Sequence, residues 1–178
     1  MQPGPIRRNR RPIRLPHYDY ASAGLYFVTI CSHQRRPLFG EIKDQKMHLN
    51  AVGKIVESEW LKTARLRENV TLDVFIVMPN HFHVIVILTE SPQFWGQQDE
   101  RPKRQFAQPL PHSLPTIVGA FKSAVTRCTR KTLQAPGAPV WQRGYFEHVI
   151  RSEKTYRQIR DYIINNPVLW RDDRYFIK

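Results

Sequence analysis

Two histidines, His81 and His83, lie one residue apart in the stretch MPNHFHVIVIL, whose other positions are mostly apolar. In a β-strand, residues i and i+2 project from the same face, so the two imidazoles would stand side by side. Imidazole nitrogens bind several divalent metals, and two imidazoles without partners would be costly to bury among apolar side chains. The pattern therefore predicts a metal-binding platform, although an H-x-H pair alone also fits two structural histidines.

A tyrosine and an asparagine near the C-terminus have the spacing of a second functional pair. Tyr162 and Asn166 are four residues apart in DYIINNP, so they would share one face of a helix. At about 100° per residue, Tyr156, Ile159 and Ile163 form the apolar stripe of that helix, and the pair lies at its edge. A tyrosine hydroxyl can be a nucleophile if it is activated, because its usual pKa is about 10. The alternative is a tyrosine at the core edge with its hydroxyl in water.

The chain carries a large excess of positive charge. Its 178 residues include 28 Lys and Arg against 15 Asp and Glu, which gives a formal net charge of +13. A small domain this basic usually binds a polyanion, although a solvated basic surface is the alternative. A metal can polarise a phosphate for attack by a tyrosine, so the three features together indicate phosphodiester cleavage on nucleic acid.

The elements that must position these residues follow from hydrophobic periodicity. Apolar and β-branched runs predict strands, and apolar positions at helical spacing predict helices. We expect strands at 24–32, 70–78 and 82–88, a short strand or hairpin within 140–151, and helices at 49–67, 113–132 and 153–166. The order β-α-β-β-α-β-α predicts an α+β fold: a ferredoxin-like (RRM-like) antiparallel sheet with helices packed on it. The C-terminal helix would carry Tyr162, and Phe82 would face away from the histidines.

The length predicts a single domain over residues 17–178, with a mobile loop at 90–112. Residues 1–16 hold five arginines and four prolines, which predicts a basic flexible arm that follows phosphates or is a tail without a role. No run approaches the roughly 20 apolar residues of a membrane span, and the N-terminus has no apolar signal segment. Two cysteines are too few for a disulfide framework. We expect a cytoplasmic protein that does not bind membranes.

Two segments carry a family resemblance. VFIVMPNHFHVIV and WQRGYFEHVIRSEKTYRQIRDYIINNP resemble the REP-associated tyrosine transposases, which are single-tyrosine HUH enzymes, and AGLYFVTICSHQRRPLFGE fits their opening strand. The resemblance covers roughly residues 14–170. An H-x-H pair alone is unspecific, whereas the MPNHFH turn and strand followed by DYIxxNP at this distance is specific.

The resemblance implies a complete reaction. His81, His83 and Asn166 would hold a divalent metal, Mg²⁺ or Mn²⁺, and Tyr162 would attack a phosphodiester of single-stranded DNA. A 5′-phosphotyrosine would form, a 3′-hydroxyl would leave, and reversal with another 3′-hydroxyl would rejoin the strands. The DNA would be a hairpin of the REP type, and the protein would be a bacterial, nucleoid-associated monomer or homodimer.

Basic side chains would then contact the hairpin DNA. They belong to the N-terminal arm, to one face of the helix at 113–132 and to the segment before the last helix: Arg7, Arg8, Arg10, Arg11, Lys122, Arg127, Arg130, Lys131 and Arg143. A non-catalytic protein that only binds hairpin DNA is the alternative function. The presence of His81, His83, Tyr162 and Asn166 together favours the enzyme.

Overall fold

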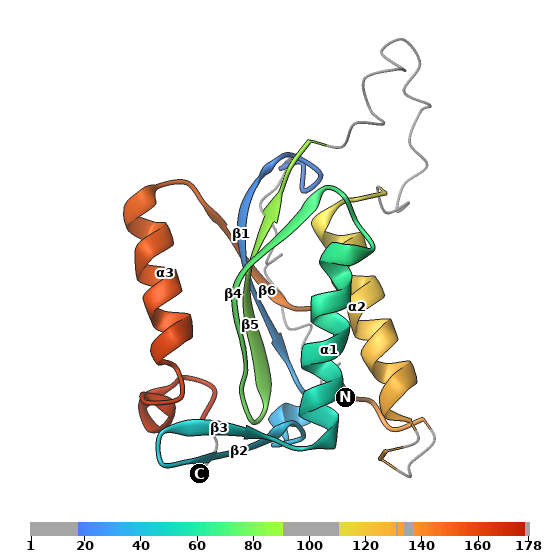
Figure 1. The fold of residues 1–178 in the computed structure, drawn as a ribbon, viewed down its shortest axis with the longest axis vertical. Helices are drawn as coiled ribbons and strands as arrows, with labels where there is room; N and C mark the ends of the chain where they lie inside the picture. Colours follow the sequence, from blue (N-terminus) through green and yellow to red (C-terminus); the bar gives the residue numbers. More distant parts are fainter. Residues whose placement is uncertain (1–17, 91–110, 131, 134–136, 177–178) are drawn as a thin grey trace, which may run out of the picture.

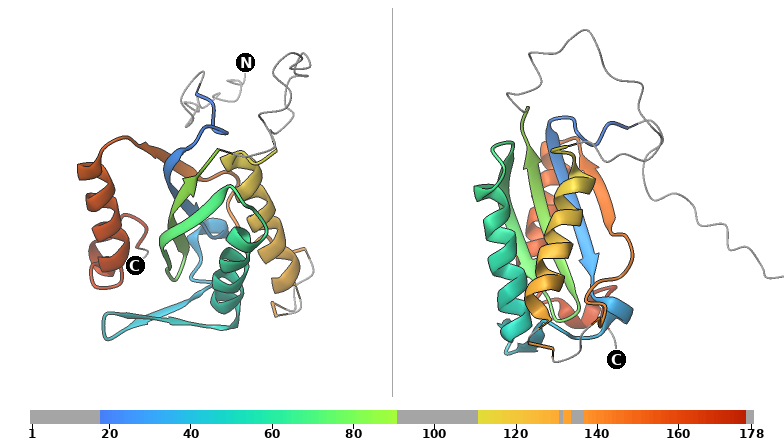
Figure 2. Two further views of the ribbon diagram at one scale, coloured as in Figure 1. Left: turned by 45° about the horizontal axis from the view of Figure 1, so that its top comes forward. Right: turned by 90° about the vertical axis from the view of Figure 1, so that its right-hand side faces the viewer.

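The fold has three layers: two helices, one antiparallel sheet, and a third helix on the other face of the sheet. The computed structural model describes residues 18–90, 111–130, 132–133 and 137–176. The sheet has the order β4-β5-β1-β6, formed by β4 (Val70–Val77), β5 (His81–Leu88), β1 (Gly24–Cys31) and β6 (Phe146–Ile150). The helices α1 (Ala51–Arg65) and α2 (Leu114–Thr129) cover one face, and α3 (Glu153–Asn165) covers the other (Figures 1 and 2). The predicted ferredoxin-like α+β fold is confirmed.

The two central strands, β1 and β5, are apolar on both faces because helices cover both. Their register places Thr29 opposite His83 and Ile30 opposite Phe82. Phe82 is fully buried on the side of α1 and α2, where its ring lies 5.4 Å from that of Trp60. Since side chains alternate along a strand, His81 and His83 face α3. The histidines therefore lie on the sheet face that the tyrosine helix covers.

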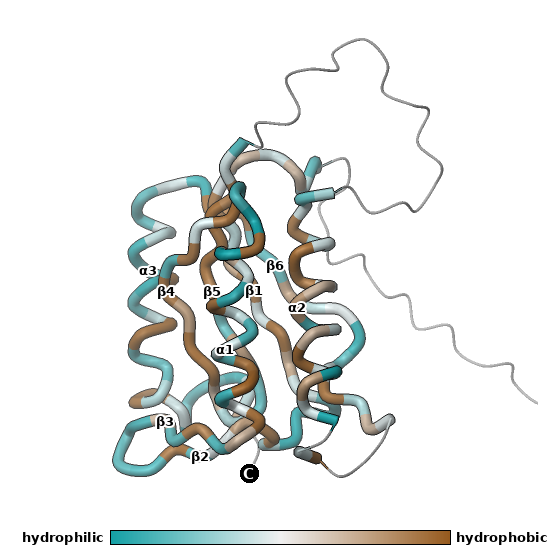
Figure 3. The backbone as a smooth tube through the Cα atoms, turned by 45° about the vertical axis from the view of Figure 1, so that its right-hand side comes forward, coloured by the Kyte–Doolittle hydropathy of each residue, from teal (hydrophilic) through white to brown (hydrophobic). Residues whose placement is uncertain are grey.

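The helices α1 and α2 begin where the sequence predicted. Asn50 is the N-cap of α1, and its Oδ1 accepts a hydrogen bond of 2.9 Å from the amide of Gly53. Ser113 precedes α2, with Pro115 in the first turn. Both helices pack an apolar stripe into one core cluster with the sheet, and Figure 3 shows hydrophobic residues recurring along each of them. The buried members of that stripe are Val52, Val56, Trp60, Leu114, Ile117, Val118, Phe121 and Val125.

The helix α3 begins at its N-cap, Ser152, which accepts a hydrogen bond of 3.2 Å from the amide of Thr155. Two contacts, made by Tyr156 and by Ile163, then fix the helix to the sheet. The hydroxyl of Tyr156 donates to Asp73 Oδ2 over 2.8 Å, at the point where the register of β4 shifts against β5. Ile163 is fully buried in an apolar cluster with Phe27, Ile85 and Ile150. These contacts fix where the second half of α3 lies over β5.

A small hairpin was missing from the sequence prediction. The strands β2 (Gly40–Lys43) and β3 (Lys46–Leu49) form a separate two-stranded sheet, and the short 3₁₀ helices η1 (His33–Arg35) and η3 (Trp170–Asp172) were also not predicted. Asp44 and Gln45 form the hairpin turn with φ of 48° and 60°. Gly or Asn usually mark such a turn, so the sequence carries a weak signal here.

The predicted basic arm, residues 1–16, and nearly all of the predicted loop at 90–112 lie outside the described residues. Within the described ranges, no helix combines the length and apolarity that a membrane crossing needs.

Replacing Gly53 by alanine is expected to destabilise the protein. A Cβ atom at Gly53 would lie 2.1 Å from the carbonyl oxygen of Phe39, which itself accepts a hydrogen bond of 3.1 Å from the amide of Asn50. Because that backbone is tied to the helix cap, we expect Gly53→Ala to lower the free energy of unfolding by about 1–3 kcal/mol in urea titrations.

The matched control is Gly119→Ala in α2, where a Cβ atom would meet nothing within 4 Å. An alanine in an exposed helix position is about 0.5–1 kcal/mol more favourable than glycine, so this variant should be stabilised. Equal unfolding midpoints for the two variants would contradict the close packing of α1 against residue 39.

Candidate metal centre and nucleophile

His81 is held with its Nε2 free to bind a metal. Its side chain is fully buried, and Nδ1 lies 2.9 Å from Asn80 Oδ1. Asn80 Nδ2 donates to the carbonyl of Tyr175 over 2.8 Å, which orients the amide so that its oxygen faces the imidazole. His81 therefore donates its Nδ1 proton, and the Nε2 lone pair is available. Burial lowers the pKa of His81 to about 4, although nearby Asp173 and Asn166 act to raise it.

His83 stands beside it, with the two ring centroids 4.3 Å apart. Its Nδ1 lies 2.8 Å from the Thr29 hydroxyl oxygen, and its Nε2 lies 3.2 Å from the hydroxyl oxygen of Tyr162. Burial lowers the pKa of His83 well below its usual value, and the charges of His81 and Arg174 lower it further. Both imidazoles are therefore neutral at neutral pH, which is the form that binds metals.

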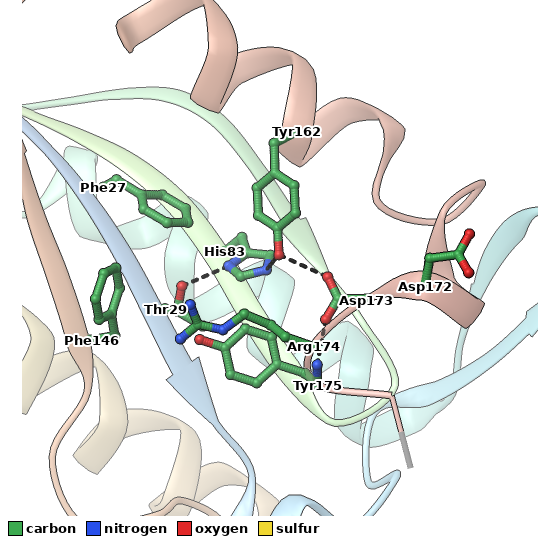
Figure 4. Close-up of a pocket in the computed structure, with 9 residues that line it drawn as sticks. All are labelled: Phe27, Thr29, His83, Phe146, Tyr162, Asp172, Asp173, Arg174 and Tyr175. Atoms are coloured by element: carbon green, nitrogen blue, oxygen red, sulfur yellow. Dashed lines mark hydrogen bonds between the residues drawn. The ribbon is translucent and has the colours of Figure 1, made fainter. Parts of the chain in front are cut away.

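Tyr162 comes from α3 and points across the sheet toward His83 (Figure 4). Its hydroxyl donates a hydrogen bond of 2.7 Å to Asp173 Oδ2. Its ring lies edge-on to that of Phe27, with centroids 6.3 Å apart. Burial and, secondly, the hydrogen bond to Asp173 raise the pKa of Tyr162 above its ordinary value. The tyrosine is thus protonated at rest, and the nearest acceptor for its proton is the Asp173 carboxylate.

Asp173 is a site residue that the sequence analysis missed. Its Oδ2 also accepts from Asn166 Nδ2 over 2.7 Å, and its Oδ1 accepts from the amide of Tyr175 over 2.6 Å. His81, His83 and Asp173 offer ligand atoms that all lie within 4.8 Å of one another, so this group could hold a metal ion. Asp173 follows η3 and lies outside both motifs, and no periodic pattern marks it. Only the fold brings it to the histidines.

Asn166 lies at the C-cap of α3, next to Asp173. It precedes Pro167, yet it has helical dihedrals, with φ of −56° and ψ of −39°. Its side chain is fully buried, and within the described residues neither its Oδ1 nor His81 Nε2 makes a hydrogen bond. Buried acceptors without partners are costly. A divalent cation would satisfy both atoms, so the residues present fit the metal centre that the sequence predicts.

A cavity of about 390 Å³ gives access to this group from the α3 side of the sheet (Figure 4). His83, Tyr162 and Asp173 line it, so a molecule that enters would lie beside the tyrosine hydroxyl. The side chains of His81, His83 and Asn166 are fully buried. The remaining lining residues are aromatic, polar or charged: Phe27, Thr29, Phe146, Asp172, Arg174 and Tyr175.

The side chains predicted to contact DNA are not gathered at this cavity. Arg127 and Arg130 are exposed on α2, which covers the opposite face of the sheet, and they line a groove of about 460 Å³ with Lys122. The Lys122 ammonium donates to the carbonyls of Gln142 and Gly144 over 2.8 and 2.9 Å, and burial lowers its pKa. Arg143 is exposed. Arg7, Arg8, Arg10, Arg11 and Lys131 lie outside the described residues.

Two known proteins are similar to this chain in sequence. A Haemophilus influenzae protein described only as an uncharacterized protein is 41% identical over 174 residues, which covers 95% of this chain and 94% of that protein. The chain belongs to the family of this Haemophilus protein. A second protein of the same species, named "Putative REP-associated tyrosine transposase", is 27% identical over 150 residues, covering 84% of this chain and 73% of that protein. No family model matches the chain.

The fold agrees with a solved structure. The structure of a REP-associated tyrosine transposase bound to a REP hairpin matches with a TM-score of 0.52 and 22% identity, covering 87% of this chain and 73% of that one. At this identity the match shows a shared fold. With the similar sequence of the second Haemophilus protein, it confirms the resemblance to REP-associated tyrosine transposases that the motifs predicted.

Proposed function

We propose that the protein nicks and rejoins single-stranded DNA at hairpin-forming sequences, through a covalent link to Tyr162. One observation carries the proposal. The Tyr162 hydroxyl oxygen lies 3.2 Å from His83 Nε2 and 2.7 Å from Asp173 Oδ2, at the wall of an accessible cavity. A nucleophile, a proton acceptor and a metal-ligating imidazole are thus within reach of one reacting phosphate.

His81, His83 and Asn166 would hold the divalent metal, Mg²⁺ or Mn²⁺. The support is the two buried acceptors without partners, His81 Nε2 and Asn166 Oδ1, and the neutral imidazoles. A cation bound there would polarise the scissile phosphate. Asp173 adds a negative charge beside the same site, which favours a cation over an anion at this position.

In the proposed covalent step, Tyr162 is the nucleophile and Asp173 accepts its proton. The Tyr162 hydroxyl oxygen attacks phosphorus as its proton passes to Asp173 Oδ2, to which it is already hydrogen-bonded. The bond between phosphorus and the 3′-oxygen breaks, and that oxygen leaves with a proton from solvent. A 5′-phosphotyrosine remains. Attack by a different 3′-hydroxyl reverses the step, so the strands rejoin without an external energy source.

Hairpin DNA is the proposed substrate because of the relatives and the charge. One relative is named as a REP-associated tyrosine transposase, and the solved structure with the shared fold holds a REP hairpin. The net charge of +13 supports a nucleic acid partner. We propose contacts with hairpin phosphates for Arg127, Arg130 and Arg143, and for the arginines of residues 1–16. Tyr162 meets His83 of its own chain, so one chain contains all the proposed catalytic groups.

The test is the formation of a protein–DNA adduct. The purified protein is incubated with 5′- or 3′-labelled single-stranded oligonucleotides that contain REP-type hairpins, with Mn²⁺ or Mg²⁺. We expect an adduct that survives denaturing electrophoresis and carries only the label on the 3′ side of the nick, because the 5′-phosphate becomes linked to Tyr162. Chelation of the metal should prevent it. Tight hairpin binding without any adduct would instead support the non-catalytic hairpin-binding function.

A further inference from the structure

Arg174 is a cation in the cavity, and it has no role in the proposed reaction as described above. It lines the cavity together with Tyr162 and His83 (Figure 4). Its guanidinium carbon lies 4.7 Å from the centre of the Tyr175 ring and 5.4 Å from that of Phe146. Contacts of this kind hold a guanidinium through its flat face and leave N–H donors at its edges. The side chain is therefore positioned by aromatic rings rather than by a carboxylate.

The charge of Arg174 is not neutralised by an ion pair. Among the residues that the structure describes, no carboxylate oxygen lies within 4.0 Å of its guanidinium nitrogens. The neighbouring carboxylate, Asp173, is already occupied by the Tyr162 hydroxyl, the Asn166 amide and the backbone amide of Tyr175. A positive charge without a carboxylate partner among the described residues thus lines the same cavity as Tyr162, which is where an anionic group would enter.

We propose that Arg174 is a catalytic residue that binds a non-bridging oxygen of the scissile phosphate. This assignment rests on the proposed function. When the tyrosine oxygen attacks, negative charge is spread over the phosphate oxygens, and a fixed guanidinium stabilises that charge. Arg174 follows Asp173 directly, so the segment 170–176 supplies both the proton acceptor and the phosphate-binding cation. The sequence offers no sign of this, because the segment lies outside both family motifs.

The first experiment measures binding without chemistry. In a Tyr162→Phe background and without divalent metal, the affinity for a hairpin oligonucleotide is compared with that for the same oligonucleotide carrying a neutral methylphosphonate at the scissile position. We expect the methylphosphonate to weaken binding roughly 10- to 100-fold when Arg174 is present, which corresponds to a charge-assisted hydrogen bond. In the Arg174→Ala or Arg174→Gln variant, the two oligonucleotides should bind within about threefold of each other.

The matched control is Arg171→Ala, because Arg171 is an exposed arginine of η3, three residues before Arg174, and it does not line the cavity. It should keep the full methylphosphonate penalty. If Arg174→Ala and Arg174→Gln also keep the full penalty, the assignment of Arg174 is wrong.

The second experiment measures the rate of adduct formation with Tyr162 intact. Arg174→Ala should slow single-turnover adduct formation by roughly 100-fold at saturating DNA, and Arg174→Lys should recover part of that loss because it restores charge without the planar donors. Arg171→Ala should match the wild type. If the wild type forms adducts and Arg174→Ala forms them as fast, only the role of Arg174 is overturned. If the wild type itself forms none, the proposed function fails.

Discussion

Replacing Tyr162 by phenylalanine is expected to abolish the covalent adduct and leave hairpin binding within about threefold of the wild type. The hydroxyl is the proposed nucleophile, and loss of a nucleophile typically lowers the rate by a factor of about 10³ or more. The amount of adduct should therefore fall to the limit of detection. The ring contact with Phe27 remains, and Asp173 Oδ2 keeps its hydrogen bond from Asn166. We therefore expect a loss of only about 1 kcal/mol in the free energy of unfolding.

Tyr156→Phe is the matched control for this variant. Tyr156 lies on the same helix, and its hydroxyl donates to Asp73 Oδ2 over 2.8 Å, away from the histidines. Its loss should cost about 1 kcal/mol of stability and leave the rate of adduct formation within a few-fold of the wild type. Adducts that persist in Tyr162→Phe but disappear in Tyr156→Phe would assign the nucleophile to Tyr156. Adduct formation is measured with labelled hairpin oligonucleotides under single-turnover conditions.

The sequence predicted the parts of the site that depend on local periodicity. The alternation along β5 places His81 and His83 on one face and Phe82 on the other, and both follow from the strand geometry. The helical spacing places Tyr162 and Asn166 on one side of α3. The order of the elements then fixes a sheet that α3 can cover. The face on which a side chain lies depends only on the local periodicity of its element, and the order of the elements follows from the same patterns along the chain. A single sequence is therefore enough for these inferences.

The sequence could not predict the residues that the fold brings in from irregular segments. Asp173 and Arg174 follow a short 3₁₀ helix, where neither period 2 nor period 3.6 applies. The helical spacing also predicted that Lys122 is an exposed phosphate contact, and this role stays a prediction. In the structure its ammonium is half-buried against two backbone carbonyls. Helical spacing identifies the face on which a side chain lies, but not the loop that packs against that face.

Replacing either histidine of the pair by alanine is expected to remove metal binding together with adduct formation. His81, His83 and Asp173 offer ligand atoms within 4.8 Å of one another, so either variant removes one of the two imidazole ligands of the proposed centre. We expect the affinity for Mn²⁺ to fall at least about 100-fold in His81→Ala and in His83→Ala, measured by calorimetric titration. The adduct should fall below detection in both variants.

The control separates loss of metal from loss of fold. His148 is an exposed histidine on β6, so His148→Ala should bind Mn²⁺ and form adducts as the wild type does. Because a ligand that binds only the folded state raises the unfolding temperature, Mn²⁺ should stabilise the wild type and His148→Ala but neither site variant. If His81→Ala and His83→Ala still gain the same stabilisation from Mn²⁺, the pair does not bind the metal. The buried acceptors His81 Nε2 and Asn166 Oδ1 would then need another partner.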